Sequence, residues 1–391
     1  MEQEQANRRW SRSAYLAMLI NGLCASSGSV VLAILRERYG LSYDFAGLLL
    51  ALISVGNMAA GFLSGVLPDL IGMRGSALLL VGGAAVGYGL LCFTGWPAAL
   101  LLAFTLVGIT KGCATNNSTV LISQAAPGKA GTMNLLHACF ATSSLLCPFF
   151  IALFSRKGLP WYAPMAALAV AGGALWLVFA QARLPAKPRG QRAAGSDWGF
   201  LHSRLFWLVT CMMFFQNCSE ITFTGWVVTY FQDSGILTGE LGNLTVTVIW
   251  GSMLVMRLLI CFVFRIRDNF KALALMAGAS MAAYFLLLRA KTGPAALGAL
   301  VLFGLAIAGT SPTGISSAGK LLSNASVGVL LPVASLGAII MPYIVGAVAQ
   351  KAGIVGGMSC ILVSLACMLA FALVCRRETR KEQARAAQSA G

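Results

Sequence analysis

The chain has 391 residues, of which 58% are hydrophobic and only 10% are charged, and its mean hydropathy is +0.81. A soluble globular protein carries about 25% charged residues, so this composition excludes a soluble enzyme, a nucleic-acid-binding domain and a disordered chain. It indicates an all-α polytopic membrane protein, whose apolar surface faces lipid instead of water.

Twelve apolar stretches of about 20 residues follow one another along the chain, each long enough for a transmembrane helix. Because eleven further spans follow the first, we interpret the first as a signal anchor and not as a cleaved signal peptide. The predicted spans are 13–35, 45–67, 76–94, 98–123, 133–154, 164–181, 205–231, 244–264, 272–289, 295–319, 328–350 and 355–375.

The basic residues predict the orientation of these spans. If both termini are cytoplasmic, most of the 28 Lys and Arg residues lie on the inner side, among them Arg8, Arg9 and Arg12 and the tail 376–385. This is the bias that the positive-inside rule describes. We therefore predict a multi-pass protein of the cell membrane, and the net charge of +16 indicates topology and not a nucleic-acid partner.

A stretch rich in Pro, Gly and Arg at residues 182–204 divides the spans into two sets of six. It predicts an N-terminal six-helix bundle at 1–181, a cytoplasmic linker, and a C-terminal six-helix bundle at 205–391 with a short cytoplasmic tail. Two pseudo-symmetric six-helix repeats are typical of alternating-access transporters. A shift of about 194–197 residues overlays Asn21 on Asn217, 107–109 on 303–305, and 146–150 on 340–344.

Residue patterns for catalysis are missing from the sequence. All eleven Cys lie inside predicted spans without a CxxC pair, and the two His are far apart, so neither disulfides nor a metal site is predicted. No nucleophile–base arrangement and no Walker-type phosphate loop is present. We therefore expect no enzymatic activity, no cofactor and no direct use of ATP.

Lys111 is one of three charged residues in the interior of the predicted spans, with Glu220 and Arg257. A charge near the middle of a membrane helix costs at least about 2.5 kcal/mol, which makes each a functional candidate. Lys111 lies roughly 18–20 Å from either interface, too far to snorkel. Its helix also carries Thr115, Asn116 and Asn117, so these four residues are predicted to line a substrate cavity; a structural ion pair is the alternative.

Glu220 is the only carboxylate in any predicted span, and Gln216, Asn217 and Thr224 surround it at helical spacing. Three roles are open: the protonation site that couples transport, an ion-pair partner of Lys111 across the two halves, or a direct hydrogen-bond partner of the substrate. Arg257 lies only about 10 Å from the predicted cytoplasmic end of its span, which leaves a structural and a functional role equally open.

Glycines and prolines inside the spans predict helix breaks or close helix contacts of the kind that bend during alternating access. They are Pro148, Pro312, Pro332 and Pro342 with Gly108, Gly304, Gly309 and Gly337.

The loop between the second and third spans contains Gly65, Asp69, Gly72 and Arg74. This spacing resembles the Gly-x-x-x-Asp-(Arg/Lys)-x-Gly-x-(Arg/Lys)-(Arg/Lys) motif of the major facilitator superfamily, although Leu70 and Gly75 replace usual basic residues. The resemblance implies a cytoplasmic gate in which Asp69 contacts Arg74 and the N-terminus of a helix, for which we expect the eleventh span.

A narrower resemblance, at residues 127–137 and at Glu220, Trp226 and Tyr230, is to fucose-permease-like sugar transporters. It implies that Trp226 and Tyr230 form a platform for a sugar ring; an interfacial aromatic belt is the alternative. Proton-coupled members carry an acidic residue where this chain has Thr115, so their coupling mechanism does not transfer.

These observations predict a secondary active transporter for a small hydrophilic metabolite. If Glu220 couples transport to protons, we expect the protein to be a symporter. The sugar-transporter resemblance favours a sugar, whereas two cations against one anion in the spans favour a sugar acid or another organic anion. The expected partners are the substrate, the lipid bilayer and, if Glu220 couples transport, protons; the expected assembly is a monomer. The alternatives are an exporter of drugs or amphipathic compounds, and a non-transporting membrane receptor or assembly component.

Overall fold

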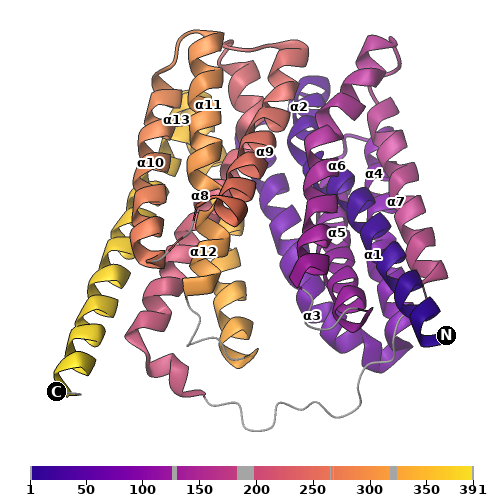
Figure 1. Ribbon diagram of the computed structural model, residues 1–391. Helices are drawn as coiled ribbons and strands as arrows, with labels where there is room; N and C mark the ends of the chain where they lie inside the picture. The colour runs from indigo at the N-terminus through magenta and orange to yellow at the C-terminus, as the bar shows by residue number, and fades with distance from the viewer. Residues whose placement is uncertain are drawn as a thin grey trace. The chain divides into compact units, whose positions relative to one another are not determined.

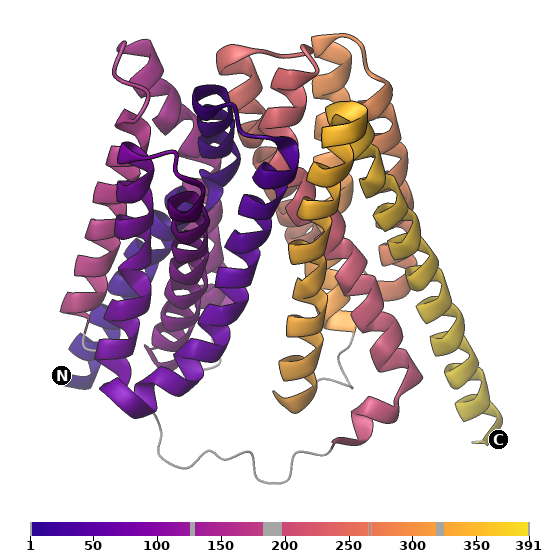
Figure 2. The same ribbon diagram turned by 180° about the vertical axis from the view of Figure 1, so that it is seen from behind.

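The computed structural model describes residues 2–125, 130–182, 198–264, 266, 268–317 and 324–389. Within these residues every regular element is a helix. The chain divides into two compact units, Met1–Gln191 and Arg192–Gly391, and the long helices of each unit run roughly parallel to one another (Figures 1 and 2). Most of the predicted linker, residues 183–197, lies outside the described residues.

The first unit contains seven described helices because the first predicted span is divided at Ser27 and the third at Gly82. One long helix instead runs through the second predicted span into the third, with Gly72 at a sharp bend. The helices are α1 (Glu2–Ser26), α2 (Gly28–Tyr39), α3 (Tyr43–Val81), α4 (Gly83–Phe93), α5 (Pro97–Ala125), α6 (Ala130–Arg156) and α7 (Ala163–Gln181).

The second unit opens with a short 3₁₀ helix and is otherwise α-helical in its described part. Its tenth predicted span is interrupted after Ile307, and its last two predicted spans form one helix that bends at Gly353. The elements are η1 (Trp198–His202), α8 (Arg204–Asp233), α9 (Gly239–Phe262), α10 (Asn269–Arg289), α11 (Gly293–Ile307), α12 (Thr310–Ser317) and α13 (Asn324–Ser389).

Ten segments of the described chain are long and apolar enough to cross a membrane. Two features account for the difference from twelve predicted spans: α8 is not among the ten, and the region of α13 that holds two predicted spans counts once. The protein has the predicted all-α, polytopic membrane fold, and α8 is less apolar because it carries the polar residues around Glu220.

The same helix contact occurs in both units at the two glycines that the predicted repeat overlays. A Cβ atom on Gly108 of α5 would collide with the carbonyl oxygen of Ile53 on α3. A Cβ atom on Gly304 of α11 would lie 2.7 Å from Cβ of Ser252 and 3.2 Å from the carbonyl oxygen of Ile249 on α9. The predicted close contacts at Gly108 and Gly304 are confirmed, since only glycine lets these backbones approach so closely.

Turns of the two units also correspond. Gly40 after α2 and Gly235 after α8 both have positive φ angles, of 62° and 71°. Gly158 after α6 and Gly353 within α13 have φ angles of 63° and 75°. Both pairs are 195 residues apart, which agrees with the repeat in the sequence.

The interruption between α1 and α2 is satisfied inside its own unit. The hydroxyl of Tyr88 on α4 donates to the carbonyl oxygen of Cys24 at 2.6 Å and lies 2.6 Å from the Ser27 hydroxyl. The Ser27 hydroxyl also donates to Cys24 O at 2.9 Å. Because lipid offers no hydrogen bonds, a helix break in a membrane needs such internal partners.

Candidate functional site

Glu220 lies in the middle of α8 with its side chain almost completely buried. One turn earlier, the Gln216 amide Nε2 donates a hydrogen bond to Glu220 Oε2. One turn later, the Thr224 hydroxyl bonds back to the carbonyl oxygens of Glu220 and Ile221, at 2.9 and 3.1 Å. The i, i+4 spacing therefore places Gln216 on the carboxylate but leaves Thr224 bound to its own helix.

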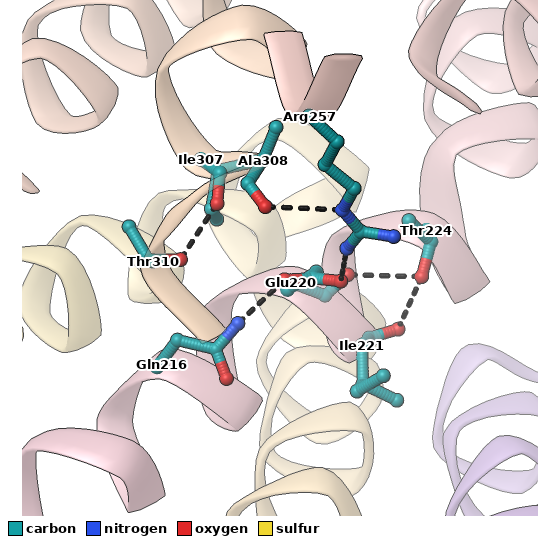
Figure 3. Close-up of polar contacts among 8 residues, drawn as sticks. All are labelled: Gln216, Glu220, Ile221, Thr224, Arg257, Ile307, Ala308 and Thr310. Carbon is teal, nitrogen blue, oxygen red and sulfur yellow. Dashed lines mark hydrogen bonds and ion pairs between the residues drawn. The ribbon is translucent and has the colours of Figure 1, made fainter. Parts of the chain in front are cut away.

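Arg257 of α9 supplies the opposite charge (Figure 3). Its Nη2 atom lies 3.6 Å from Glu220 Oε1, so the two ionisable residues predicted for spans seven and eight form an ion pair. The Arg257 side chain is 36% exposed and that of Glu220 is 9% exposed. The pair thus has a buried carboxylate and a partly accessible guanidinium group.

The same guanidinium group reaches a break in the tenth predicted span. Helix α11 ends at Ile307 and α12 begins at Thr310, and Arg257 Nε donates to the carbonyl oxygen of Ala308 at 3.1 Å. The Thr310 hydroxyl donates to the carbonyl oxygen of Ile307 at 2.6 Å. A helix end leaves its last carbonyls without partners, and these two side chains supply them (Figure 3).

Arg257 therefore contacts two helices besides its own, α8 through a charge and the α11–α12 break through a backbone carbonyl. The sequence indicated Glu220 and Arg257 separately and left a structural or a functional role open for Arg257. It did not indicate Ala308 as the second contact; the only available signal was Gly309, which was predicted as a break or close contact.

The polar residues predicted on the fourth span divide into two groups. Asn21 of α1 donates through Nδ2 to the carbonyl oxygen of Lys111 at 3.2 Å and to the Thr115 hydroxyl at 3.1 Å. Asn116 is exposed, whereas Asn117 is buried and donates to the Cys113 sulfur at 3.1 Å. Lys111 and Thr115 thus lie at the α1–α5 contact, while Asn117 packs inside the bundle.

Asn21 entered the prediction only as a repeat position, matched to Asn217, and its link to α5 was missed. The two asparagines behave differently: Asn217 is half-buried and donates to Met213 O of its own helix at 3.1 Å. A polar residue in an apolar span is the signal that could have identified Asn21.

Trp226 and Tyr230 of α8 are both buried between helices of the second unit. Trp226 is 0% exposed and donates through Nε1 to the carbonyl oxygen of Pro342 on α13 at 3.2 Å. Tyr230 is 1% exposed and donates to the carbonyl oxygen of Leu287 on α10 at 3.2 Å. Both rings are enclosed by neighbouring helices in this structure, so their role as a platform for a sugar ring stays a prediction.

The predicted gate motif is described in part. Gly72 has φ 75° and ψ 161°, a conformation that an L-residue rarely adopts. Arg74 donates through Nη2 to the carbonyl oxygen of Ala180 at the end of α7, at 2.8 Å. The side chain of Asp69 and the surroundings of Gly65 lie outside the described residues, so the Asp69 contacts stay a prediction.

No group of three or more His, Cys, Asp or Glu side chains in the described part of the chain could hold a metal ion. Its polar chemistry is instead an ion pair and amide groups held within a multi-pass helical membrane fold. This fold and this arrangement define a multi-pass membrane protein with a charged centre inside one helical unit.

The sequence pattern of the Major Facilitator Superfamily matches residues 14–331. The chain therefore belongs to this superfamily of transporters.

Solved transporter structures share the fold. The nucleoside transporter NupG superposes with a TM-score of 0.72 at 12% identity, over 95% of this chain and 98% of that one. A bacterial homologue of the human lysosomal transporter Spinster, inward-facing and unoccupied, superposes with a TM-score of 0.69 at 14% identity, over 95% of this chain and 97% of that one. Comparison with curated protein sequences found no match.

Proposed function

We propose that this protein is a secondary active transporter that moves a small hydrophilic metabolite by alternating access. The observation that carries the proposal is the Glu220–Arg257 ion pair, 3.6 Å long, with Gln216 on its carboxylate. Ionisable groups inside a membrane bundle are costly, which is why they mark substrate and ion pathways. Partial exposure of Arg257 supports contact between its guanidinium group and a ligand.

The charge balance of this centre supports a neutral, polyhydroxylated substrate such as a sugar. Glu220 and Arg257 cancel each other's charge, so together they offer hydrogen-bond donors and acceptors without attracting an ion. Asn217 and Thr224, both half-buried on α8, add further polar groups. One structural neighbour is a nucleoside transporter, and nucleosides, which carry sugar hydroxyl groups, belong among the substrates to test.

A sugar acid or another organic anion is the second candidate, and Lys111 favours it. This residue lies on α5 with Thr115 and Asn116, and its side chain is half-buried. An ammonium group deep in a membrane span attracts an anionic substrate. A structural ion pair of Lys111 is the alternative to substrate recognition.

Glu220 is our candidate for proton coupling, because it is the only carboxylate in the predicted spans. Protonation would remove the charge that Arg257 contacts and leave Arg257 with the Ala308 carbonyl alone. The same proposal places the protein in the cell membrane as a monomer with both termini in the cytoplasm, gated on that side by Gly65, Asp69, Gly72 and Arg74.

Uptake into proteoliposomes tests the proposal directly. Purified protein is reconstituted and assayed with neutral sugars, nucleosides, sugar acids and organic anions, with and without a pH gradient. We expect saturable uptake of one of these classes and its loss in Arg257→Gln, with Arg204→Gln as the control because Arg204 is an exposed residue of the same unit, 74% accessible. Binding without flux would contradict transport and support the receptor alternative.

Two further variants separate the substrate and coupling alternatives. Lys111→Gln should abolish uptake of anions only if Lys111 recognises charge, and uptake of every substrate if it forms a structural ion pair. Glu220→Gln should retain exchange but lose its response to the pH gradient if Glu220 couples protons. Unchanged uptake with an unchanged pH response would exclude the coupling role.

A further inference from the structure

Three arginines border a hollow at one end of the first unit. Arg8, Arg9 and Arg12 of α1 line it together with Ser13 and Leu16, and the end of α7 contributes Val178 and Gln181. Its volume is about 550 Å³. The start of α1 and the end of α7 lie beside each other in Figure 1, so the hollow belongs to this one unit.

Packing of Trp10 fixes the position of the arginines. Trp10 is partly buried and packs against the core cluster of the first unit, which includes Ala14, Met18 and Phe179. Arg9 and Arg12 are exposed and are three residues apart, so they lie on one face of α1. The core contact of Trp10 therefore directs two guanidinium groups away from the bundle and over the hollow.

The charged residues of the hollow lie nearer the start of α1 and its apolar residues lie deeper, as headgroups and acyl chains do in a membrane. The first segment long and apolar enough to cross a membrane begins at Arg8, so we expect the arginines at the level of lipid headgroups. Leu16, one turn deeper than Arg12, is 48% exposed, and Val178 of α7 is partly exposed beside it. A molecule that fits must carry negative charge at one end and a hydrocarbon chain at the other.

We propose that this hollow binds the headgroup of an anionic phospholipid. Guanidinium groups bind phosphate oxygens through paired hydrogen bonds, and basic pockets between transmembrane helices at the membrane surface bind anionic headgroups. Arg9 and Arg12 hold the phosphate, and the acyl chains lie along Leu16. The site is separate from the Glu220–Arg257 centre, so it does not depend on the proposed substrate.

Lipid binding to the purified full-length protein tests this site. The protein in a neutral detergent is titrated with phosphatidylglycerol or with phosphatidylcholine, and bound lipid is counted by native mass spectrometry. Arg9→Gln combined with Arg12→Gln should weaken phosphatidylglycerol binding on the order of 25-fold, because each basic residue at a membrane surface contributes roughly fivefold. Phosphatidylcholine should bind weakly to the original protein and the variant alike.

Two control variants distinguish the loss of this site from a change in total charge and from misfolding. Arg377→Gln with Lys381→Gln removes the same charge from the tail of α13 and should leave phosphatidylglycerol binding within about twofold. Arg9→Lys with Arg12→Lys keeps the charge but loses the paired hydrogen bonds, so its binding should lie between that of the original protein and that of the Gln variant. Equal losses in the Gln variants of α1 and α13 would overturn the proposal, as would binding unaffected by the α1 substitutions.

Competition with soluble phosphates shows whether the hollow binds a lipid or a free anion. Inorganic phosphate and glycerol 3-phosphate are added as competitors during the phosphatidylglycerol titration. Failure of both to displace the lipid at millimolar concentration supports the proposal, because neither has acyl chains to contact Leu16. Displacement by inorganic phosphate alone would overturn it and assign the hollow to a small soluble anion.

Discussion

Arg257 joins Glu220 to the carbonyl oxygen of Ala308, with distances of 3.6 Å to the carboxylate and 3.1 Å to the carbonyl. One guanidinium group thus connects a buried charge on α8 with the break between α11 and α12. The five N–H groups of arginine in a rigid plane permit this double contact, which lysine could not reproduce. A change in the charge of Glu220 therefore acts on the same guanidinium group that supports the helix break.

Arg257 and Glu220 should be energetically coupled. We expect Arg257→Gln and Glu220→Gln each to lower the free energy of unfolding, and the double variant to lose less than their sum. The expected coupling energy between the two substitutions is about 1–3 kcal/mol. It is smaller than for a fully buried ion pair because Arg257 is partly exposed. Unfolding in mixed micelles measures it, with Arg204→Gln as control; additive losses would show that the two side chains do not interact.

Gly304 should not tolerate alanine. A Cβ atom there would lie 2.7 Å from Ser252 Cβ, and forcing the helices apart should cost about 1–3 kcal/mol of unfolding free energy. Gly298 on the same helix has open space at this position, so Gly298→Ala should be neutral or stabilising by up to about 1 kcal/mol. Equal melting temperatures of the two variants would contradict the close contact of α11 with α9.

Trp226 should affect stability more than substrate recognition. Trp226→Phe keeps an aromatic ring but removes the hydrogen bond to Pro342 O, so we expect a loss of about 0.5–1.5 kcal/mol in unfolding free energy. The KM for the transported substrate should change less than twofold relative to the original protein. A large rise in KM with unchanged stability would support the predicted stacking role instead.

Gly72 should resist substitution because of its backbone conformation and not because of crowding. Its φ angle is 75°, and a Cβ atom would meet no atom within 4 Å. Gly72→Ala should therefore destabilise the protein by about 1 kcal/mol or more. Gly75→Ala, which would make only ordinary contacts with Ile71, is the matched control and should be neutral or slightly stabilising by thermal unfolding.

Much of the fold could be predicted from the sequence because hydrophobicity is a local property. Spans appear as runs of about 20 apolar residues, and the repeat appears as Gly108 and Gly304 at matching positions. The interrupted helices were less predictable. Pro148 and Pro342 lie inside continuous helices, whereas the first span breaks at Ser27, where Tyr88 of α4 supplies the hydrogen bonds.

For this protein, the sequence alone determined the membrane class, the resemblance to its superfamily and the rarity of charge inside the spans, which singled out Lys111, Glu220 and Arg257. Of these, Glu220 and Arg257 meet in the second unit. Tertiary structure decided that these two residues form a pair, that Arg257 also holds Ala308, and that Trp226 and Tyr230 are enclosed by helices. The physical reason is that helical spacing shows which side chains share a face, whereas the rotation and packing of each helix select what that face contacts.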